Sequence, residues 1–339
     1  VVNMKHGDLR GYRFWLRDQQ EDYYRRHLLL HEFAHVYMSC DTGLNNIGAG
    51  WFMEGAAELF ATHAISQGTP DFGILPHTFE GLEGWGRIST IRRQRVDRPA
   101  VDVELQSIPP LPSVQFPQGD AARDEARYSW WWALAWMLSH HPDYSTDWTA
   151  LCHSRGSAEF HTLMNTMQER YGRRLHSDWL LFADSVCEQF DPQRSFPIHL
   201  EDGTTRPDRL TLAADAGWQD SGWELQAEET VHISVSGECI PEQTSAPWIS
   251  EPNGITLEYN QGSPLGQTLA VLVSGDDGWI SRRIPVATGR ILTAQRNARL
   301  WLQINDSAGS RQNNSGDYQV TIQLSAESTG SRSSGQQTD

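Results

Sequence analysis

Two histidines with a glutamate beside the first are the residues best able to do chemistry in this chain. His31 and His35 are four residues apart, and Glu32 directly follows His31. On a helix this spacing places both imidazoles on one face, one turn apart, with Cβ atoms about 5–6 Å from each other. Two imidazole nitrogens so placed can bind one Zn²⁺ through bonds of about 2.0–2.1 Å. Glu32 would then lie beside the metal, where a carboxylate can take a proton from an activated water.

The third metal ligand must come from elsewhere in the sequence. A catalytic zinc ion takes three protein ligands and keeps one position for water. Glu54 is the best candidate, with 18 residues between it and His35. Glu58 follows one helical turn later on the same face, where it can accept the free ring N–H of a ligating histidine. A histidine pair alone would fit an ordinary surface helix, but Glu54 and Glu58 together favour a metal site.

These motifs resemble those of the gluzincin metallopeptidases. The chain reads HEFAH and then, after 18 residues, WFMEGAAE. The second run is similar to the W-x-x-E-G-x-A-E pattern of the peptidase-MA-like branch, and the resemblance covers roughly residues 15–190. It implies a zinc metallopeptidase in which His31, His35 and Glu54 bind Zn²⁺. It also implies that Glu32 is the general base and acid. Glu58 would contact a zinc-ligating histidine without binding the ion itself.

A later helix extends the resemblance, and two departures limit it. Tyr128-Ser129-Trp130 resembles the opening of the Tyr-x-x-(Ala/Ser)-Trp-Ala-Leu helix of the same group, which implies that Tyr128 donates a hydrogen bond to the oxyanion.

Gluzincins usually have a β-sheet before the active helix, and only about 20 residues precede it here. The G-x-M-E-N signature of the aminopeptidase branch is absent, so the resemblance does not imply aminopeptidase activity and leaves endo- or exopeptidase action open.

The second motif is rich in hard oxygen donors. Residues 305–316 read NDSAGSRQNNSG, in which Asp306, Ser310, Asn313 and Asn314 could bind one Ca²⁺. By composition alone, a hairpin turn explains the segment as well. The order of residues, however, resembles the calcium- and galactose-binding lectins of the PA-IL type over about residues 208–324.

This second resemblance implies a jelly-roll sandwich in which those four residues, with a backbone carbonyl near Pro241, hold Ca²⁺. In such lectins two sugar hydroxyls complete the calcium shell. The other sugar-contacting side chains do not align with residues of this chain, so the resemblance does not extend to galactose specificity.

Periodicity and turn residues predict the organisation of the chain. Apolar residues at three- and four-residue steps predict helices at about 21–38, 51–65, 86–95, 123–140, 156–171 and 175–189. Residues 1–20 show no clear strand. Short β-type runs follow at 223–226, 230–236, 268–274, 290–295, 298–305 and 317–324.

The predicted fold class is multi-domain α+β. It comprises a mainly helical gluzincin domain, an all-β jelly-roll or galactose-binding-like sandwich, a linker and a disordered tail. Their predicted ranges are 1–190, 208–324, 191–207 and 325–339, respectively.

The composition of the chain limits the classes of partner that it is expected to bind. The formal net charge of −16 argues against binding to nucleic acid or to an anionic membrane surface, and no apolar run is long enough to span a bilayer. Cys40, Cys152, Cys187 and Cys239 form no C-x-x-C pair, so a cysteine zinc site is not expected. No signal-peptide pattern is present, and we expect a mature or trimmed chain in an extracellular or periplasmic space.

Two functional hypotheses follow. The first is a zinc-dependent peptidase that acts on protein or peptide substrates and docks on extracellular or cell-surface glycans through a calcium-dependent, lectin-like domain. The second is a carbohydrate-binding protein that carries an inactive metallopeptidase relic. The remaining histidines are expected to be ordinary surface or core residues, among them His63 on the Glu54 helix but off its ligand face.

Overall fold

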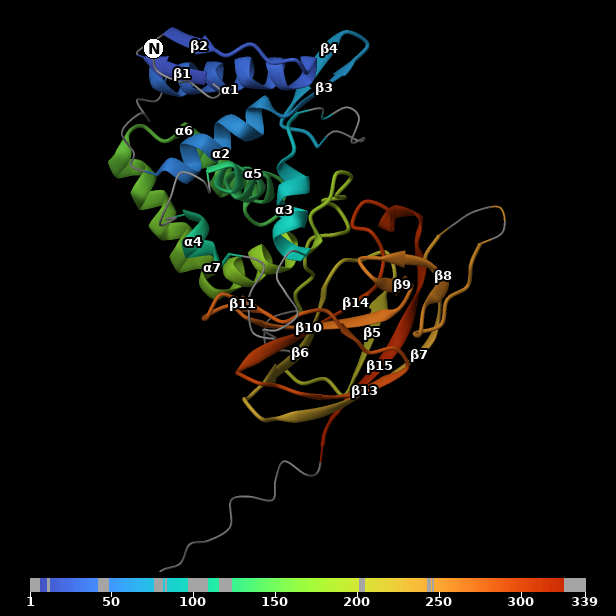
Figure 1. Cartoon of the computed structure of the whole chain (residues 1–339). Coiled ribbons are helices and arrows are strands. Elements are labelled where there is room, and N and C mark those ends of the chain that lie inside the picture. Colours follow the sequence, from blue (N-terminus) through green and yellow to red (C-terminus); the bar gives the residue numbers. More distant parts are fainter. Residues whose placement is uncertain are drawn as a thin grey trace, which may run out of the picture. The chain divides into compact units, whose positions relative to one another are not determined.

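The chain divides into two compact units, residues 1–192 and 193–339. The computed structural model describes residues 7–10, 13–41, 49–75, 82, 84–96, 109–115, 124–200, 205–242, 245 and 247–325. The first unit is mainly helical and the second consists of antiparallel strands, so the chain has the predicted multi-domain α+β class (Figure 1).

The first unit combines helices with two short β-hairpins. Its elements in chain order are β1 (Gly7–Arg10), β2 (Arg13–Leu16), α1 (Asp22–Asp41), α2 (Gly50–Ala61), β3 (His63–Ser66), β4 (Thr69–Phe72), α3 (Arg87–Val96), α4 (Leu111–Gln115), α5 (Asp124–His140), α6 (Ser145–His153) and α7 (Ser157–Ser185).

The prediction that no strand precedes the first long helix is wrong. Strands β1 and β2 pair in antiparallel register, from Gly7 opposite Leu16 to Arg10 opposite Arg13. The alternation in β2 is only four residues long, with Phe14 half-buried between exposed Arg13 and Trp15. Such a short run is hard to distinguish from a loop by periodicity.

Helix α2 is the central element of the helical unit, and in Figure 1 it lies between α1 and α5. Trp51, Phe52 and Ala57 on this helix are almost completely buried. Gly55 faces α5, and a Cβ atom added there would lie 2.7 Å from the carbonyl oxygen of Trp131. The missing side chain therefore allows the two helices to approach closely, which holds α2 in place beneath α1.

Helix α2 is shorter than its apolar pattern predicts. It ends at Ala61, and Thr62 adopts extended backbone angles while its hydroxyl donates to the carbonyl of Glu58 at 2.9 Å. Gln67 and Gly68 both have positive φ, which is the geometry of a two-residue hairpin turn between β3 and β4. His63 therefore belongs to strand β3, not to the Glu54 helix as the pattern predicts.

Helix α7 combines the last two predicted helices. Its backbone leaves helical geometry at Gly172, where φ is 42° and ψ is −116°. This kink is the break that the Tyr171-Gly172 dipeptide predicts. Helices α4 and α6 are not predicted, because α4 is short and α6 lies in a polar stretch after Pro142.

The second unit is built from two larger antiparallel sheets that share one apolar core, together with a separate two-stranded sheet. Its strands are β5 (Arg209–Ala213), β6 (Gln219–Leu225), β7 (Thr230–Ile240), β8 (Ile255–Asn260), β9 (Ser263–Leu265), β10 (Thr268–Ser274), β11 (Trp279–Ile280), β12 (Ile284–Pro285), β13 (Gly289–Thr293), β14 (Ala298–Ile304) and β15 (Ser315–Leu324). One sheet has the order β11-β10-β14-β6 and the other β13-β7-β15-β5.

Alternating side chains connect the two sheets of this unit. Val231, Ile233 and Val235 of β7 point into the core, where they join Leu300 and Leu302 of β14 from the other sheet. This is the pattern expected of a sandwich, in which every second residue of each strand is buried. Ile198, from the segment predicted as a linker, forms a β-bridge with Gln219 of β6, so the second unit begins before residue 208.

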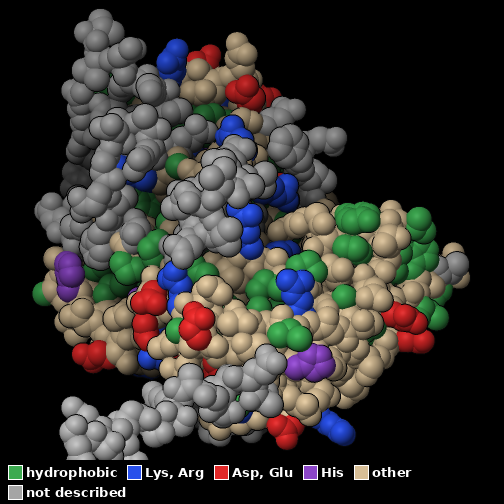
Figure 2. Space-filling view, turned by 60° about the horizontal axis from the view of Figure 1, so that its bottom comes forward, with side chains coloured by type: hydrophobic (Ala, Val, Ile, Leu, Met, Phe, Trp, Pro, Cys, Tyr) green, Lys and Arg blue, Asp and Glu red, His purple; other side chains and the backbone are tan. Residues whose placement is uncertain are grey.

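The remaining predictions about the chain concern its C-terminal tail, its cysteines, membrane-spanning helices and surface charge. Most of the predicted tail, 326–339, is outside the described residues. All four cysteines are free thiols. In the part of the chain that the structure describes, no helix is long and apolar enough to cross a membrane. Figure 2 shows one face of the molecule, on which acidic and basic side chains are interspersed despite the negative net charge.

The close contact between α2 and α5 predicts a glycine requirement. We expect Gly55→Ala to lower the free energy of unfolding by about 1–3 kcal/mol, because the added methyl group would meet the Trp131 carbonyl. Gly50→Ala is the control, since nothing lies within 4 Å of its Cβ position. Thermal unfolding followed by calorimetry compares the two. An unchanged or higher melting temperature for Gly55→Ala would contradict the packing.

Candidate metal centre

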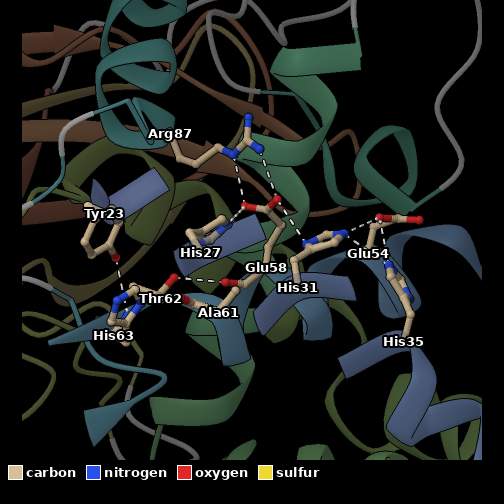
Figure 3. A network of polar contacts seen from close by, with 10 residues as sticks. All are labelled: Tyr23, His27, His31, His35, Glu54, Glu58, Ala61, Thr62, His63 and Arg87. Atoms are coloured by element: carbon tan, nitrogen blue, oxygen red, sulfur yellow. Dashed lines mark hydrogen bonds and ion pairs between the residues drawn. The ribbon is translucent and has the colours of Figure 1, made fainter. Parts of the chain in front are cut away.

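Helices α1 and α2 present two facing ladders of polar side chains. Helix α1 carries His27, His31 and His35 at successive four-residue steps, and α2 carries Glu54 and Glu58 one turn apart. Residues four apart lie on the same helical face, so each ladder points in one direction. Figure 3 shows the glutamates reaching toward the histidines, with His31 between Glu54 and Glu58.

Three donor atoms converge at one end of the ladders. The Nε2 atoms of His31 and His35 are 3.1 Å apart, and Oε2 of Glu54 lies 3.2 Å from the first and 3.4 Å from the second. A tetrahedral ion with bonds of about 2.0–2.1 Å has its donor atoms about 3.3–3.4 Å apart. The three atoms therefore fit three corners of a tetrahedral zinc site.

The environment of this triad combines burial with limited access. The side chain of His31 is 7% exposed and that of His35 13%, whereas that of Glu54 is 27% exposed. Two neutral imidazoles and one carboxylate are the donor set of several catalytic zinc sites, which keep a fourth position for water. The partial exposure of Glu54 indicates that the site is reached by solvent from its side.

Glu58 is held by charged and polar neighbours on several sides. Its carboxylate accepts two hydrogen bonds of 3.0 Å from Arg87, through Nε and Nη2. Nδ1 of His31 lies 3.3 Å from Oε1, and Nε2 of His27 lies 3.3 Å from Oε2. These two ring contacts do not have hydrogen-bond geometry and are electrostatic contacts. Glu58 thus lies where the pattern predicts a partner for the ring N–H of a ligand.

The carboxylates around the triad hold a proton on His31. Burial alone lowers the pKa of His31, but its polar contacts with Glu54 and Glu58 outweigh burial and raise that pKa to about 10. Burial raises the pKa of Glu54, but its contacts with His31 and His35 prevail and lower it to about 2. For Glu58, burial is again outweighed, first by the charge of Arg87, and the pKa lies well below its usual value. Two ionised carboxylates are thus balanced by the guanidinium of Arg87 and the protonated ring of His31, and a metal ion at this site would take the place of that proton.

Of the two other predicted catalytic residues, Tyr128 lies near the triad in space and Glu32 adjoins it in the sequence. Glu32 directly follows His31 on α1 and is buried, with 7% of the residue exposed. The ring of Tyr128 on α5 lies 6.2 Å from that of His31, measured between centroids. Burial, followed by the charges of Glu54 and Glu58, raises the pKa of Tyr128 above its ordinary value. The phenol therefore keeps its proton and remains a hydrogen-bond donor.

Two residues of the network are not among the predicted site residues, His27 and Arg87. His27 is completely buried, with the rings of Tyr24 and Trp85 around it. Its spacing of four residues before His31 is a signal that the sequence does contain. Arg87 has no such signal, because it follows Glu58 by 29 positions and reaches it only through the fold.

Two other histidines that the structure describes, His63 and His141, take structural positions. Nδ1 of His63 contacts the carbonyl of Ala61, and its ring stacks on Tyr23. His141 is buried beside Asp178, with Nε2 3.7 Å from the carboxylate. His77 lies outside the described residues.

In the second unit, the predicted calcium ligands share the loop between β14 and β15. Asp306 and Asn314 are both buried, and Nδ2 of Asn314 donates to Oδ2 of Asp306 at 2.9 Å. Ser310 and Asn313 flank and end a short 3₁₀ turn, Arg311–Asn313, within the same loop. Ser315 pairs with Ile240 at the end of β7, which brings Pro241 opposite this loop.

Unsatisfied oxygens make the loop suitable for a hard cation. The Oδ1 atoms of Asn313 and Asn314 are buried and have no hydrogen-bond partner. Burial raises the pKa of Asp306, against a hydrogen bond from Asn314 and the charge of Arg311. Buried amide and carboxylate oxygens of this kind are the ligands that Ca²⁺ prefers.

Comparison with known proteins gives only distant likenesses. The chain matches no protein-family model and no curated protein sequence. Similar solved structures include the N-terminal domain of EclA, described as a PllA-like lectin, which is 18% identical. The match covers 34% of this chain and 95% of that one, with a TM-score of 0.28.

Two further solved structures are PliG proteins, periplasmic inhibitors of g-type lysozyme. The protein from Salmonella Typhimurium is 14% identical, with coverage of 38% of this chain and 97% of that one and a TM-score of 0.20. The protein from Aeromonas hydrophila is 7% identical, with coverage of 39% and 96% and a TM-score of 0.21. At these TM-scores none of the likenesses carries an argument about function.

The raised pKa of His31 predicts that zinc binding releases a proton. Below about pH 10 the metal-free ring is protonated, and a metal ligand must lose the proton on its donor nitrogen. The apparent zinc affinity should therefore rise with pH, by up to tenfold per unit from this group, and level off above its pKa.

Calorimetric titration with Zn²⁺ at pH 6 in buffers of different ionisation enthalpy measures this proton. A zinc-bound water, with a pKa of about 7, still keeps most of its protons at that pH. His153→Ala, on an exposed histidine of α6, should leave the proton count unchanged. Zinc binding without proton release would contradict the electrostatics of the centre.

Proposed function

We propose that this chain is a zinc-dependent metallopeptidase that hydrolyses peptide bonds. The observation that carries the proposal is the convergence of three donor atoms, from His31, His35 and Glu54, within 3.1–3.4 Å of one another. These are the residues that the resemblance to gluzincins implies. Their partial exposure on the Glu54 side would let a substrate reach the ion.

The residues around the triad suit the hydrolysis of an amide. A zinc ion held by His31, His35 and Glu54 would supply a Lewis acid, which polarises a carbonyl group and lowers the pKa of bound water. Glu32, next to a ligand on α1, acts as the general base and returns the proton to the leaving amine. Tyr128, kept protonated by burial and by neighbouring carboxylates, donates a hydrogen bond to the oxyanion. Glu58 orients the ring of His31.

For the second unit, we propose calcium-dependent docking on glycans. The supporting observations are the buried Asp306 carboxylate and the unpartnered oxygens of Asn313 and Asn314 in one loop. A Ca²⁺ ion there would bind through these oxygens, and sugar hydroxyls could complete its shell. Glycans on a cell surface or in an extracellular matrix would then bring the peptidase close to its protein substrates, in an extracellular or periplasmic setting.

The proposed catalytic role of Glu32 predicts a loss of activity without loss of metal. We expect Glu32→Gln to lower the rate of cleavage of a generic protein substrate by about 10²–10⁴-fold, because the amide cannot accept the proton. Bound zinc, measured by elemental analysis, should stay at the wild-type level. Glu169→Gln, at an exposed site on α7, is the matched control.

Two outcomes would argue against this mechanism. Full activity of Glu32→Gln would exclude the glutamate as the base. Zinc binding by the wild-type chain without chelator-sensitive cleavage would instead favour the second hypothesis, a carbohydrate-binding protein with an inactive metallopeptidase unit.

The proposed calcium loop predicts a loss of affinity on removal of its charge. Asp306→Ala should weaken Ca²⁺ binding by at least tenfold in calorimetric titration, because the loop loses its predicted charged ligand. Asp208→Asn, at an exposed position before β5, should bind as the wild type does. A glycan array with and without Ca²⁺ tests the docking itself. Equal Ca²⁺ affinity in both variants would identify the loop as a plain turn.

A further inference from the structure

The two ladders contain a second set of metal-capable side chains beside the first. His27, His31 and Glu58 offer ligand atoms within 4.8 Å of one another, as do His31, His35 and Glu54. His31 belongs to both sets, because Nε2 faces Glu54 and Nδ1 faces Glu58. All three members of the second set are buried. By ligand type alone, the chain could therefore hold two ions joined through the ring of His31, once both ring nitrogens have lost their protons.

A guanidinium group already occupies the carboxylate of this second set. Arg87 donates to both oxygens of Glu58, with Nε 3.0 Å from Oε2 and Nη2 3.0 Å from Oε1. This planar, two-pronged pairing is the strongest geometry available to an arginine and a carboxylate. The side chain of Arg87 is 9% exposed, and its Cζ lies 5.4 Å from the centroid of the Tyr128 ring.

Charge balance explains why an arginine fits this position. A fixed guanidinium neutralises Glu58 permanently, while Glu54 keeps its charge for an exchangeable ion. A second divalent ion would put two cations on one imidazole in a buried region, where like charges repel strongly. With Arg87 present, both oxygens of Glu58 are already engaged, so the carboxylate is poorly available to metal.

We propose that Arg87 is the resident cation of the second set. It takes the place of a second metal ion, keeps the centre mononuclear, and fixes Glu58 so that the ring of His31 presents Nε2 to the first set. Arg87 is in this sense a positioning residue, since it acts on the metal through Glu58 and His31. The inference rests on the proposed zinc site, and counting bound ions separates the two.

His27 completes the second set from helix α1. It is 0% exposed, and neither ring nitrogen makes a hydrogen bond that meets strict geometry. A buried imidazole with a carboxylate at 3.3 Å is a ready ligand once that carboxylate is released. Removal of Arg87 should therefore expose a site that the native chain keeps closed.

The test is to count the zinc ions bound by the full chain and by four variants, one of which is a double substitution. Arg87→Met removes the charge and keeps an unbranched aliphatic side chain. Arg87→Lys keeps the charge but cannot form the two-pronged guanidinium–carboxylate pairing. Arg93→Met, on the solvent side of the same helix, is the control. Calorimetric titration with Zn²⁺ and elemental analysis after gel filtration give the stoichiometry, and Co²⁺ absorption reports the coordination of the first site.

We expect one equivalent in the wild type and in Arg93→Met, with equal affinity. Arg87→Met should bind two equivalents, and adding His27→Ala to it should restore one. Arg87→Lys should keep one equivalent but bind it about 10–100-fold more weakly, with an altered Co²⁺ spectrum, as is usual when a partner of a metal ligand is disturbed.

Other results would overturn the inference. One equivalent in folded Arg87→Met, or two in the wild type, would show that Arg87 is not a substitute for a metal ion. If Arg87→Met fails to fold, unchanged zinc affinity and an unchanged Co²⁺ spectrum in Arg87→Lys would do the same. A wild type that binds no zinc would instead remove the proposed zinc site itself.

Discussion

The buried carboxylate of Glu58 is the interaction on which the centre depends. Its side chain is 3% exposed, and a carboxylate cannot remain ionised in such a place without compensation. Arg87 supplies a charge and two hydrogen bonds, and His27 and His31 approach from α1. Because Glu58 lies on α2 and Arg87 begins α3, the carboxylate connects three helices. Loss of one partner of such a buried pair typically costs about 3–5 kcal/mol.

This interaction also makes the two nitrogens of His31 different. One faces the supported carboxylate of Glu58 and the other faces Glu54, which is more exposed and contacts His35 as well. The ring is thus restrained from both sides before any ion binds. A restrained ligand has less freedom to lose on binding, which favours a tight and well-defined site. Close packing of α2 against α5 at Gly55 adds to this rigidity.

The sequence predicts some features well because they are local. Helical geometry places His31 and His35 on one face of α1 and Glu54 and Glu58 on one face of α2, and the α+β class follows from the change between helical and alternating patterns. That the two faces meet was implied only by the resemblance to gluzincins. Arg87 could not be predicted, because its contact with Glu58 spans 29 positions and depends on how α3 packs. The β1–β2 hairpin was hidden by its short, polar strands, and the end of α2 at Ala61 by an apolar pattern that continues into β3. His27 could have been predicted from the sequence, because it lies four residues before His31 and continues the same helical face.

The most direct test of the central claim, a mononuclear site made by two histidines and one glutamate, is X-ray absorption at the zinc edge of the zinc-loaded chain. We expect one zinc ion per chain, with nitrogen and oxygen neighbours at about 2.0–2.1 Å and the multiple-scattering signal of two imidazoles. Sulfur neighbours at about 2.3 Å, or a chain that retains no zinc, would contradict it.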